Sequence, residues 1–409
     1  MGDTGNFLLD GIRVVEVGTF IAGPAAATVM TDFGAEVTKI EAPGIGDPYR
    51  YLHTIKPMPE SEQDYCWILD GRNKKSVVVN LKSEAGREIV LKLSRDADVF
   101  LTNFHPSVLN DLKLTYEDVK AVNERIIYAH ATGYGEVGPE AEKPGYDMTA
   151  WWAHSGLMNL IRSADSEPSL SVAGMGDHPT AMSLFGAIMM GLYARERTGK
   201  GRKVSTSLLA NGVWANGCFI QSALCGAKPF IHQRRDEADN AMVNHYVTRD
   251  GKRFIITGIR GNVDFEAACH AIDRVDLITD ERFAEPEQRY PNMRELIAIF
   301  DAAFLTKDMA EWVMLFKTHE LTFAPVHDYT DLPNDEQLHA NGILVDLDHP
   351  RFGKLKTISS PLNASDTEKV TPTAAPTLGQ HTREVLTALG YSDQEIDALS
   401  EQGVVACEC

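Results

Sequence analysis

Short runs of branched aliphatic residues alternate with amphipathic stretches along the first half of the chain. Apolar runs of this length are typical of buried strands in parallel sheets, which helices connect and cover. The predicted strands are residues 13–17, 36–41, 77–81, 99–102, 126–130 and 203–207, and the clearest helices between them are 24–33 and 83–95. This alternation predicts a large, Rossmann-like, doubly wound α/β domain.

The pattern changes after residue 224. The segment Cys225-Gly-Ala-Lys-Pro229 and the polar run 233–240 interrupt the periodicity, so a domain boundary is predicted there. Beyond it, an Asp250-Gly251 turn joins two short apolar runs, which indicates a β-hairpin. Helices are predicted at 263–271, 294–304, 309–317, 331–342, 382–389 and 393–402. Residues 225–330 are therefore predicted to form a smaller α+β domain.

The composition indicates a globular protein with an acidic surface. The chain has 409 residues, 44% of them hydrophobic, and a formal net charge of -19. This length corresponds to roughly two or three domains. The charge argues against broad binding to nucleic acid or to anionic lipid, because both need a basic excess. A small anionic ligand held by a local basic cluster stays compatible with it.

The cysteines and the apolar stretches add expectations about chemistry and location. The 6 cysteines form no Cys-x-x-Cys pair and have no histidine spacing suited to zinc, so we expect reduced thiols and no metal. No signal pattern is visible at the N-terminus. The longest apolar stretch, 182–193, is about half of the roughly 20 residues that span a bilayer. We expect a cytoplasmic protein without membrane contact.

Asp177 is the strongest single indication of chemistry. It follows Gly174 and Gly176 and precedes a long apolar helix in which Pro179 suits the first turn. The glycines allow a tight turn and the close approach of a ligand. A carboxylate at a helix start most often caps the helix and complements its dipole. Position alone therefore leaves a helix cap and a catalytic acid both open.

Six motifs in sequence order carry a family resemblance. They are Asp70-Gly-Arg72-Asn73-Lys74-Lys75, Thr102-Asn103-Phe104, Gly133-Tyr-Gly-Glu-Val-Gly138, Pro144-Gly-Tyr146-Asp147, the Asp177 segment and Thr198-Gly-Lys-Gly201. The series resembles the family III CoA-transferases, of the formyl-CoA and carnitine CoA-transferase type, over most of the chain. Within that family it looks most like the phenyllactate and 2-hydroxyisocaproate CoA-transferase branch.

The resemblance assigns roles to the residues around Asp177. Asp177 matches the family's catalytic aspartate, which attacks the thioester of an acyl-CoA. The residues expected to support it are Gly174, Gly176, Tyr146, His178, Gly258 and Gly261. The last two match the family's glycine-rich segment over the active site. Arg260 between them departs from the all-glycine form, so a hairpin-end turn stays open as the other interpretation.

The resemblance also implies contacts with coenzyme A, which is a substrate here and the only cofactor expected. Asn103 and Phe104 match a nucleotide-binding pair, in which Phe104 offers a face for adenine. The alternative for this pair is a strand-end cap and a core phenylalanine. The other expected CoA-binding residues are Gly18, Thr19 and Phe20 along the nucleotide, and Arg72 and Lys74 at the phosphates. Plain surface charge is the alternative for the last two.

Further implications concern assembly. The family builds its large domain from both chain ends, so residues 1–224 are expected to form its N-terminal part and 331–409 a linker and a return to it. Two copies of the chain are expected to interlock as a homodimer, and the small-molecule partners are an acyl-CoA and a carboxylic acid. Composition and spacing give no sign of the interlocking.

The sequence leaves two alternative functions, and the residues of the acyl pocket, undecided. Related 2-methylacyl-CoA racemases use a histidine where this chain has Tyr146, and a tyrosine with a pKa near ~10 is a poor base at neutral pH. A non-catalytic CoA-binding protein is disfavoured by the intact Asp177. Trp151 and Trp152 are candidates for an apolar acyl pocket, with core packing as the alternative. His154 is a candidate for a substrate hydroxyl, although a structural role is favoured.

Overall fold

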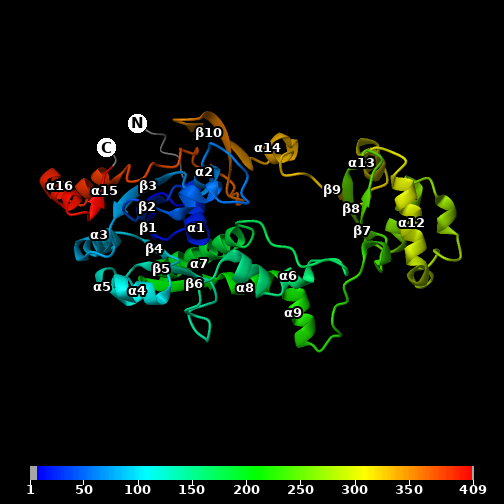
Figure 1. Cartoon of the computed structure of the whole chain (residues 1–409), viewed down its shortest axis with the longest axis horizontal. Helices are drawn as coiled ribbons and strands as arrows, with labels where there is room; N and C mark the ends of the chain where they lie inside the picture. The colour runs from blue at the N-terminus through cyan, green and yellow to red at the C-terminus, as the bar shows by residue number, and fades with distance from the viewer. Residues whose placement is uncertain (1–6, 408–409) are drawn as a thin grey trace. The chain divides into compact units, whose positions relative to one another are not determined.

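The computed structural model describes residues 7–407 of the chain, which divides into two compact units. The large unit contains residues 7–159, 170–227 and 336–407 (Figure 1). The small unit contains residues 160–169 and 228–335. Each unit has a hydrophobic core of its own. Both the N-terminal and the C-terminal segments therefore contribute to the large unit.

A sheet of seven strands in the order β12-β3-β2-β1-β4-β5-β6 forms the centre of the large unit. Its strands are β1 (Arg13–Val17), β2 (Glu36–Glu41), β3 (Lys74–Val79), β4 (Val99–Thr102), β5 (Ile127–Thr132), β6 (Arg202–Ser207) and β12 (Val405–Ala406). All neighbours pair in parallel except β12, which is antiparallel to β3. The order 3-2-1-4-5-6 is that of a doubly wound sheet. The predicted α/β class and parallel sheet are confirmed.

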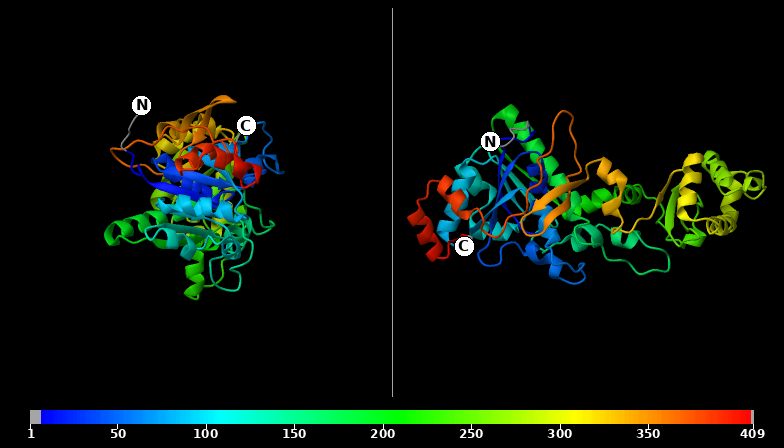
Figure 2. Two further views of the ribbon diagram at one scale, coloured as in Figure 1. Left: turned by 90° about the vertical axis from the view of Figure 1, so that its left-hand side faces the viewer. Right: turned by 90° about the horizontal axis from the view of Figure 1, so that it is seen from above.

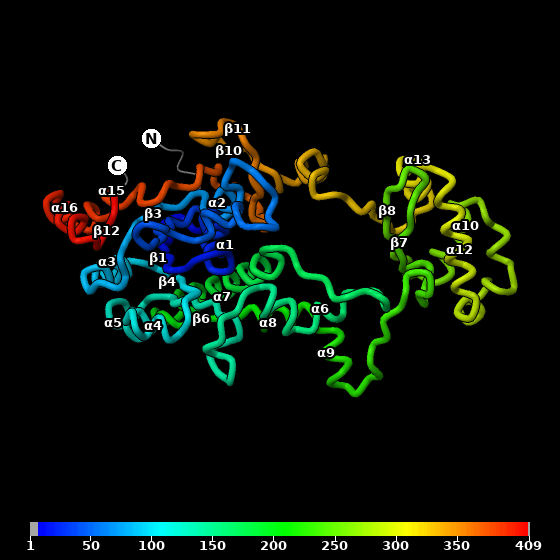
Figure 3. Tube along the Cα trace, viewed as in Figure 1, coloured from blue at the N-terminus to red at the C-terminus, as the bar shows by residue number. Residues whose placement is uncertain are grey.

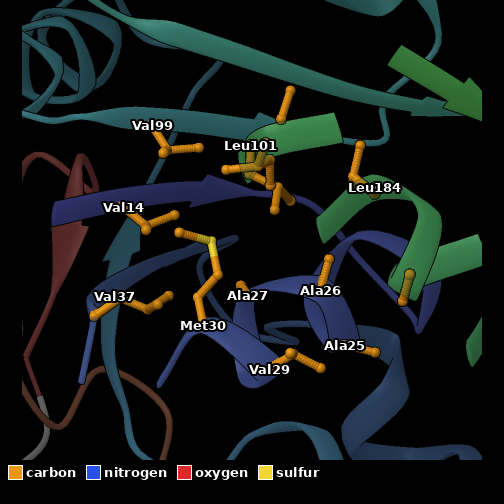
Figure 4. Packing of buried hydrophobic residues seen from close by; sticks show 14 of the residues in the cluster. Val14, Ala25, Ala26, Ala27, Val29, Met30, Val37, Val99, Leu101 and Leu184 are labelled. Atoms are coloured by element: carbon orange, nitrogen blue, oxygen red, sulfur yellow. The ribbon is translucent and has the colours of Figure 1, made fainter. Parts of the chain in front are cut away.

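Helices cover both faces of this sheet because its strands alternate their side chains. Val14 of β1 packs with α1 (Ala22–Asp32) and α7 (Asp177–Thr198), whereas Val15 belongs to the core on the other face. That other core includes α3 (Glu84–Arg95), α5 (Tyr116–Val122), α15 (Thr382–Ala388) and α16 (Asp393–Glu401). Figure 4 shows Met30 and Ala27 of α1 next to Val14.

The C-terminal segment completes one edge of the sheet. The backbone N–H of Val78 in β3 donates to Oγ1 of Thr382 at 3.0 Å, and β12 pairs with Val78 and Val79. In both views of Figure 2, as in Figure 3, the red C-terminal helices lie beside the blue and cyan elements of the N-terminal half. Residues far apart in sequence therefore share one core in the large unit.

The arrangement of β1 and β4 determines where a ligand site forms. These neighbouring strands send their helices to opposite faces, since α1 follows β1 on one face and α4 (Pro106–Leu112) follows β4 on the other. In doubly wound sheets, ligands bind outside the carboxyl ends of the strands at such a switch point. The segments 18–21 and 103–105 lie at this position.

The large unit has several smaller elements. They are η1 (Pro48–Thr54), α2 (Tyr65–Asp70), the π-helical turn η2 (Asp147–Ala153), α6 (Leu157–Leu160) at the unit boundary, α8 (Leu208–Ala215), α9 (Gly217–Leu224), α14 (Glu336–Ala340), β10 (Leu344–His349) and β11 (Gly353–Ile358). The predicted helix 331–342 is wrong in its extent, because it consists only of α14 and the 3-10 turn η6 (Leu332–Asn334). Pro333 lacks the N–H group that a continuous helix would need.

The small unit combines a three-stranded antiparallel sheet with helices. Its strands are β7 (Val243–Val247), β8 (Arg253–Thr257) and β9 (Phe323–Pro325), and its main helices are α10 (Asn262–Ala271), α11 (Pro286–Arg289), α12 (Met293–Phe304) and α13 (Met309–Thr318). The predicted hairpin is present between β7 and β8, with Gly251 at a φ of +75° in its turn. Aromatic rings fill the core, where Phe304 contacts both Phe254 and Trp312.

Candidate active site

A cleft of about 720 Å³ lies at the carboxyl ends of β1, β4 and β5 in the large unit. Its walls include residues 19–22, 103–106 and 131–133, which follow or end these strands. Gly174 and Asp177 complete it from the start of α7. The volume is within the usual range for sites that bind small molecules and cofactors. The switch point of the sheet and the Asp177 segment therefore form one site.

Asp177 is the first residue of α7, and Gly176 occupies the N-cap position without any side-chain cap. Within residues 7–407, the Asp177 carboxylate makes no hydrogen bond. Burial raises its pKa to about 7, and the negative charges of Asp147 and Asp70 add to the effect while His178 opposes it. The helix-cap interpretation lacks its hydrogen bond. Asp177 is instead a half-buried carboxylate that changes charge near neutral pH.

His178 connects the Asp177 segment to a buried carboxylate. Its Nδ1 lies 3.1 Å from the carbonyl oxygen of Gly174, and its Nε2 lies 3.3 Å from Oδ2 of Asp70. Tyr49 donates its hydroxyl proton to the same Asp70 oxygen at 2.7 Å. Burial alone would raise the pKa of Asp70, but the bonds from His178 and Tyr49 outweigh it and hold that pKa below its usual value. Because both ring nitrogens face oxygen acceptors, we infer a doubly protonated His178.

The two glycines before Asp177 have distinct structural roles. Gly174 has a φ of +81°, and its N–H donates to Oδ2 of Asp147 at 2.9 Å. A Cβ on Gly176 would lie 2.6 Å from Cγ of Trp151, so only glycine fits over this ring. The ring of Trp151 is thus the support on which the Asp177 segment rests.

Four of the residues expected to bind coenzyme A line the cleft, namely Thr19, Phe20, Asn103 and Phe104. Asn103 accepts from the N–H of Thr19 at 3.0 Å and donates to its carbonyl oxygen at 2.7 Å, which joins the ends of β1 and β4. Gly18 lies beneath them, since a Cβ there would be 3.0 Å from Oδ1 of Asn103. The strand-end role of Asn103 is therefore present together with its position in the cleft.

Phe20 has a left-handed backbone that other groups stabilise. Its φ is +61°, a region that residues other than glycine rarely adopt. Oδ1 of Asp47 accepts from the N–H of Phe20 at 3.0 Å and from that of Tyr49 at 2.9 Å. Asp47 in turn pairs with the fully buried Lys39 at 2.8 Å, and Lys39 pairs with Glu16 at 2.6 Å. An interior ion network thus fixes the cleft wall.

The assignment of Arg72 and Lys74 to the CoA phosphates is wrong. The guanidinium of Arg72 is buried and pairs with Asp32 at 2.7 Å. The ammonium of Lys74 is fully buried, pairs with Glu16 at 2.8 Å and donates to the carbonyl oxygen of Pro24 at 2.7 Å. Both cations are satisfied inside the protein. A sequence motif cannot distinguish such interior pairs from a phosphate cradle, because their partners lie on other elements.

The expected acyl-pocket residues occupy other positions. Trp151 and Trp152 are both buried, with stacked rings whose centroids are 6.1 Å apart, and neither lines the cleft. His154 is exposed, with Nδ1 3.3 Å from a carboxylate oxygen of Glu140. Tyr146 does line the cleft, with its ring edge-to-face against Phe20 at 6.1 Å. The proposal of a tryptophan wall is therefore wrong, and core packing is correct.

Several residues of the site were not assigned a role from the sequence. Asp70 and Asp147 stand inside the quoted motifs, but nothing in their spacing indicates that both lie close enough to affect Asp177. Tyr49 and Asp47 lie outside every motif. Gly258 and Gly261 belong to the small unit, so their support of the active site stays a prediction.

Within residues 7–407, no three side chains of His, Cys, Asp or Glu come together in an arrangement that would hold a metal ion. Over the same range, no helix combines the length and the apolar character that crossing a membrane requires.

Comparison with known proteins identifies the family. The sequence model of CoA-transferase family III matches residues 9–382. The chain belongs to CoA-transferase family III. It is 32% identical to the cinnamoyl-CoA:phenyllactate CoA-transferase of Clostridium sporogenes, over 96% of each chain. It is 34% identical to the succinyl-CoA:glutarate CoA-transferase of Mus musculus, over 97% of this chain and 90% of the relative.

A solved structure supports the same conclusion. The CAIB/BAIF family protein from Brucella suis superposes with a TM-score of 0.83 at 27% identity, over 94% of this chain and 100% of the other. This family III member is therefore an acyl-CoA:carboxylate CoA-transferase.

In this CoA-transferase, the raised pKa of Asp177 predicts a pH-dependent stability. The unfolded chain ionises Asp177 near its ordinary pKa, whereas the folded site disfavours the charge up to about pH 7. Ionisation therefore destabilises the fold progressively as pH rises from about 4 to about 7, and the penalty persists above that. We expect Asp177→Asn to stabilise the large unit at pH 8, on the order of 2 kcal/mol, and to lose this gain near pH 4.

Thermal unfolding of Asp177→Asn and of a control variant, Asp70→Asn, each compared with the wild type, checks this expectation. Asp70 is the control of opposite sign, because its pKa is lowered in the folded protein. Asp70→Asn should destabilise at pH 8, and this effect should shrink as pH falls. A wild-type protein that melts above Asp177→Asn at pH 8 would contradict the raised pKa.

Proposed function

We propose that this CoA-transferase works through covalent intermediates on Asp177, with 2-hydroxy or aryl carboxylic acids as its substrates. The observation that carries the mechanism is the Asp177 carboxylate itself, which has no hydrogen-bond partner among the described residues and faces a cleft at the switch point of the sheet. A pKa of about 7 leaves a substantial ionised fraction at neutral pH while keeping the carboxylate reactive.

The proposed reaction consists of four successive nucleophilic attacks. An oxygen of ionised Asp177 attacks the thioester carbonyl of the donor acyl-CoA, and the C–S bond breaks to release CoA thiolate and leave an aspartyl–acyl anhydride. The thiolate attacks the aspartyl carbonyl, which frees the donor acid and forms an aspartyl-CoA thioester. The acceptor carboxylate attacks this thioester to form a second anhydride, and CoA thiolate then attacks the acceptor's acyl carbon. Acyl-CoA and Asp177 result without ATP.

Each tetrahedral intermediate places negative charge on a former carbonyl oxygen. Among the described residues, the N–H groups of Gly176 and Asp177 donate no intramolecular hydrogen bond. As the first groups of a helix of 22 residues, they are available to an anion. His178, held as a cation by Asp70, adds positive charge beside them. These groups are our candidates for stabilising the intermediates.

We assign the adenine of coenzyme A to the face of Phe104, where aromatic stacking contributes about 1–3 kcal/mol. Phe104→Ala should therefore raise the KM for acyl-CoA about tenfold with little change in kcat, as steady-state kinetics would measure. An acyl-pantetheine thioester lacks the adenine and provides the control, because its KM should be the same for both proteins. Equal increases for the two thioesters would remove Phe104 from the nucleotide site.

The walls of the cleft support the proposed acid class. Phe20, Ile21, Leu52, Met148 and Leu208 give it an apolar surface, and no lysine or arginine is among the described residues that line it. A monocarboxylic acid with an aryl or branched side chain matches this surface, whereas the second carboxylate of a dicarboxylic acid would find no lysine or arginine among these lining residues. The relative named for phenyllactate is consistent with this choice.

We propose a homodimer, interlocked as in the family, as the working form. Helix α9 supports it, because no side chain of the apolar sequence Gly217-Cys-Phe-Ile-Gln-Ser-Ala-Leu224 is buried. On the preceding helix, Trp214 is 87% exposed. Exposed apolar surface of this kind marks an interface with another protein chain.

Trapping the intermediate tests the central step. We expect incubation with acyl-CoA and then hydroxylamine to convert the side chain of Asp177 to a hydroxamate, detected by mass spectrometry of the peptide that contains it. The yield should fall below about pH 7, since protonated Asp177 is not a nucleophile. Hydroxamate at another acidic residue would refute the proposal. So would the absence of any modification while the enzyme transfers CoA.

A further inference from the structure

The small unit contains a cavity of about 160 Å³ that is lined only by its own residues, between 239 and 296. Its walls are polar and apolar in nearly equal parts, and the apolar side chains include Met242, Ile259, Phe265, Met293 and Leu296. A cavity of about 150 Å³ is large enough for a benzene-sized molecule. The space therefore suits a ligand of about six non-hydrogen atoms.

Arg289 gives this cavity a positive charge. Its side chain is 7% exposed and stacks on Phe265, with the guanidinium carbon 4.1 Å from the ring centroid. Nε donates to the carbonyl oxygen of Phe283 at 2.7 Å, and Nη2 donates to that of Ala284 at 3.2 Å and to the side chain of Asn262. These contacts hold the guanidinium plane fixed at the cavity wall.

Arg289 forms no ion pair with any residue between 7 and 407. Among the described residues, no carboxylate oxygen lies within 4.0 Å of its guanidinium, and Nη1 has no acceptor. Glu285 before α11, Glu287 on α11 and Glu266 on α10 act only through space. The buried carboxylate nearby, Asp264, pairs with Arg260 at 2.6 Å.

An uncompensated buried cation is costly for a folded protein, and a bound anion removes that cost. Burial lowers the pKa of Arg289, yet a guanidinium keeps its charge at any physiological pH. Of the described residues at the cavity wall, only Asp239 is acidic, and it is exposed to solvent and therefore only weakly repels an anion.

We infer that this cavity binds a small monocarboxylic acid, with its carboxylate on Nη1 of Arg289 and its short apolar chain against Met242 and Met293. The apolar side chains on one part of the wall favour this class over inorganic phosphate, which has no apolar part to bury. Gly258 and Gly261 also bound the cavity, so the bound acid packs against the glycine-rich segment of the small unit. Because free carboxylic acids are what this enzyme consumes and releases, occupancy would couple that segment to the acid concentration.

Methyl NMR of the full-length protein tests the site, with butyrate as the probe and methionines labelled on their methyl carbons. The signals of Met242 and Met293 are assigned from Met242→Leu and Met293→Leu. We expect butyrate to shift both signals with a Kd of about 1 mM. Butylamine and 1-butanol, which match its chain without the negative charge, should leave both signals in place. The measurement contains no CoA, so its failure is distinct from failure of the Asp177 mechanism.

Two substitutions make the test specific for the charge. Arg289→Met should weaken butyrate binding at least about tenfold. Asp239→Asn lies on the exposed side chain, so it leaves the fold intact, and loss of its repulsion should tighten binding about threefold. Two methyl signals that stay unmoved by butyrate, or that move equally with butylamine, would overturn the inference. Unchanged affinity in Asp239→Asn would do the same.

Discussion

Asp177→Ala should lower kcat/KM for CoA transfer by at least about 10⁴-fold, because it removes the group that forms every covalent intermediate. Binding of acyl-CoA should persist, since the cleft formed by the ends of β1, β4 and β5 is intact. Steady-state kinetics with a matched acyl-CoA and acceptor acid would measure the loss, and calorimetry would measure the binding. Asp177→Asn should be as inactive, because an amide keeps the shape but is no nucleophile.

The control for this substitution is another acid at the start of a helix. Asp393 is the first residue of α16 and pairs with Arg383 on the surface of the large unit. Asp393→Ala also removes a carboxylate at the start of a helix. Asp393 does not line the cleft and is distant in sequence from every residue that does, so this variant should retain wild-type activity. A similar loss of activity in both variants would attribute the effect to helix stability. Wild-type transfer by Asp177→Ala would refute the nucleophile.

Gly176→Ala should lower kcat about 100-fold while changing the KM for acyl-CoA little. Its backbone has a φ of -95°, which alanine adopts without strain, so the effect comes from the added methyl group alone. That methyl would lie 2.6 Å from Cγ and 2.7 Å from Cβ of the buried Trp151. The segment must move away from the ring, and a shift of this size displaces Asp177 from the thioester.

The same helix provides a matched glycine. Gly186 lies in α7, and a Cβ there would meet nothing within 4 Å. Gly186→Ala should keep full kcat and should slightly raise the melting temperature, because alanine favours the helix. Kinetics and thermal unfolding of the two variants side by side separate a local clash from a general effect on α7. Full activity in Gly176→Ala would show that the ring of Trp151 does not fix the nucleophile.

Much of the large unit could be predicted because its core strands are apolar and short. The strands at 13–17, 36–41 and 99–102 have the predicted bounds. The strand at 77–81 starts earlier than predicted, at Lys74, because the lysine side chain is buried by its pairing with Glu16. A hydrophobic pattern does not show a polar residue whose counter-charge lies on another strand.

In the candidate site too, local motifs could be predicted, whereas contacts between residues distant in sequence could not. Asp177, Asn103 and Phe104 have local motifs, and all three line the cleft. The contact between His178 and Asp70 joins residues 108 positions apart, so no spacing could predict it. The stacking of Trp151 on Trp152 lies in the π-helical turn η2, and the helical periodicity of the sequence does not predict it.

Because β12 pairs with β3, one edge of the central sheet can be completed only when the last residues of the chain have been synthesised. All residues of the small unit lie before 336, so they leave the ribosome while the central sheet still lacks its edge. The core on one face of this sheet is incomplete until α15, α16 and β12 have been synthesised. Until then, apolar residues on that face of the strands lack part of their cover. We therefore expect the unfinished chain to be more prone to aggregation than the completed protein.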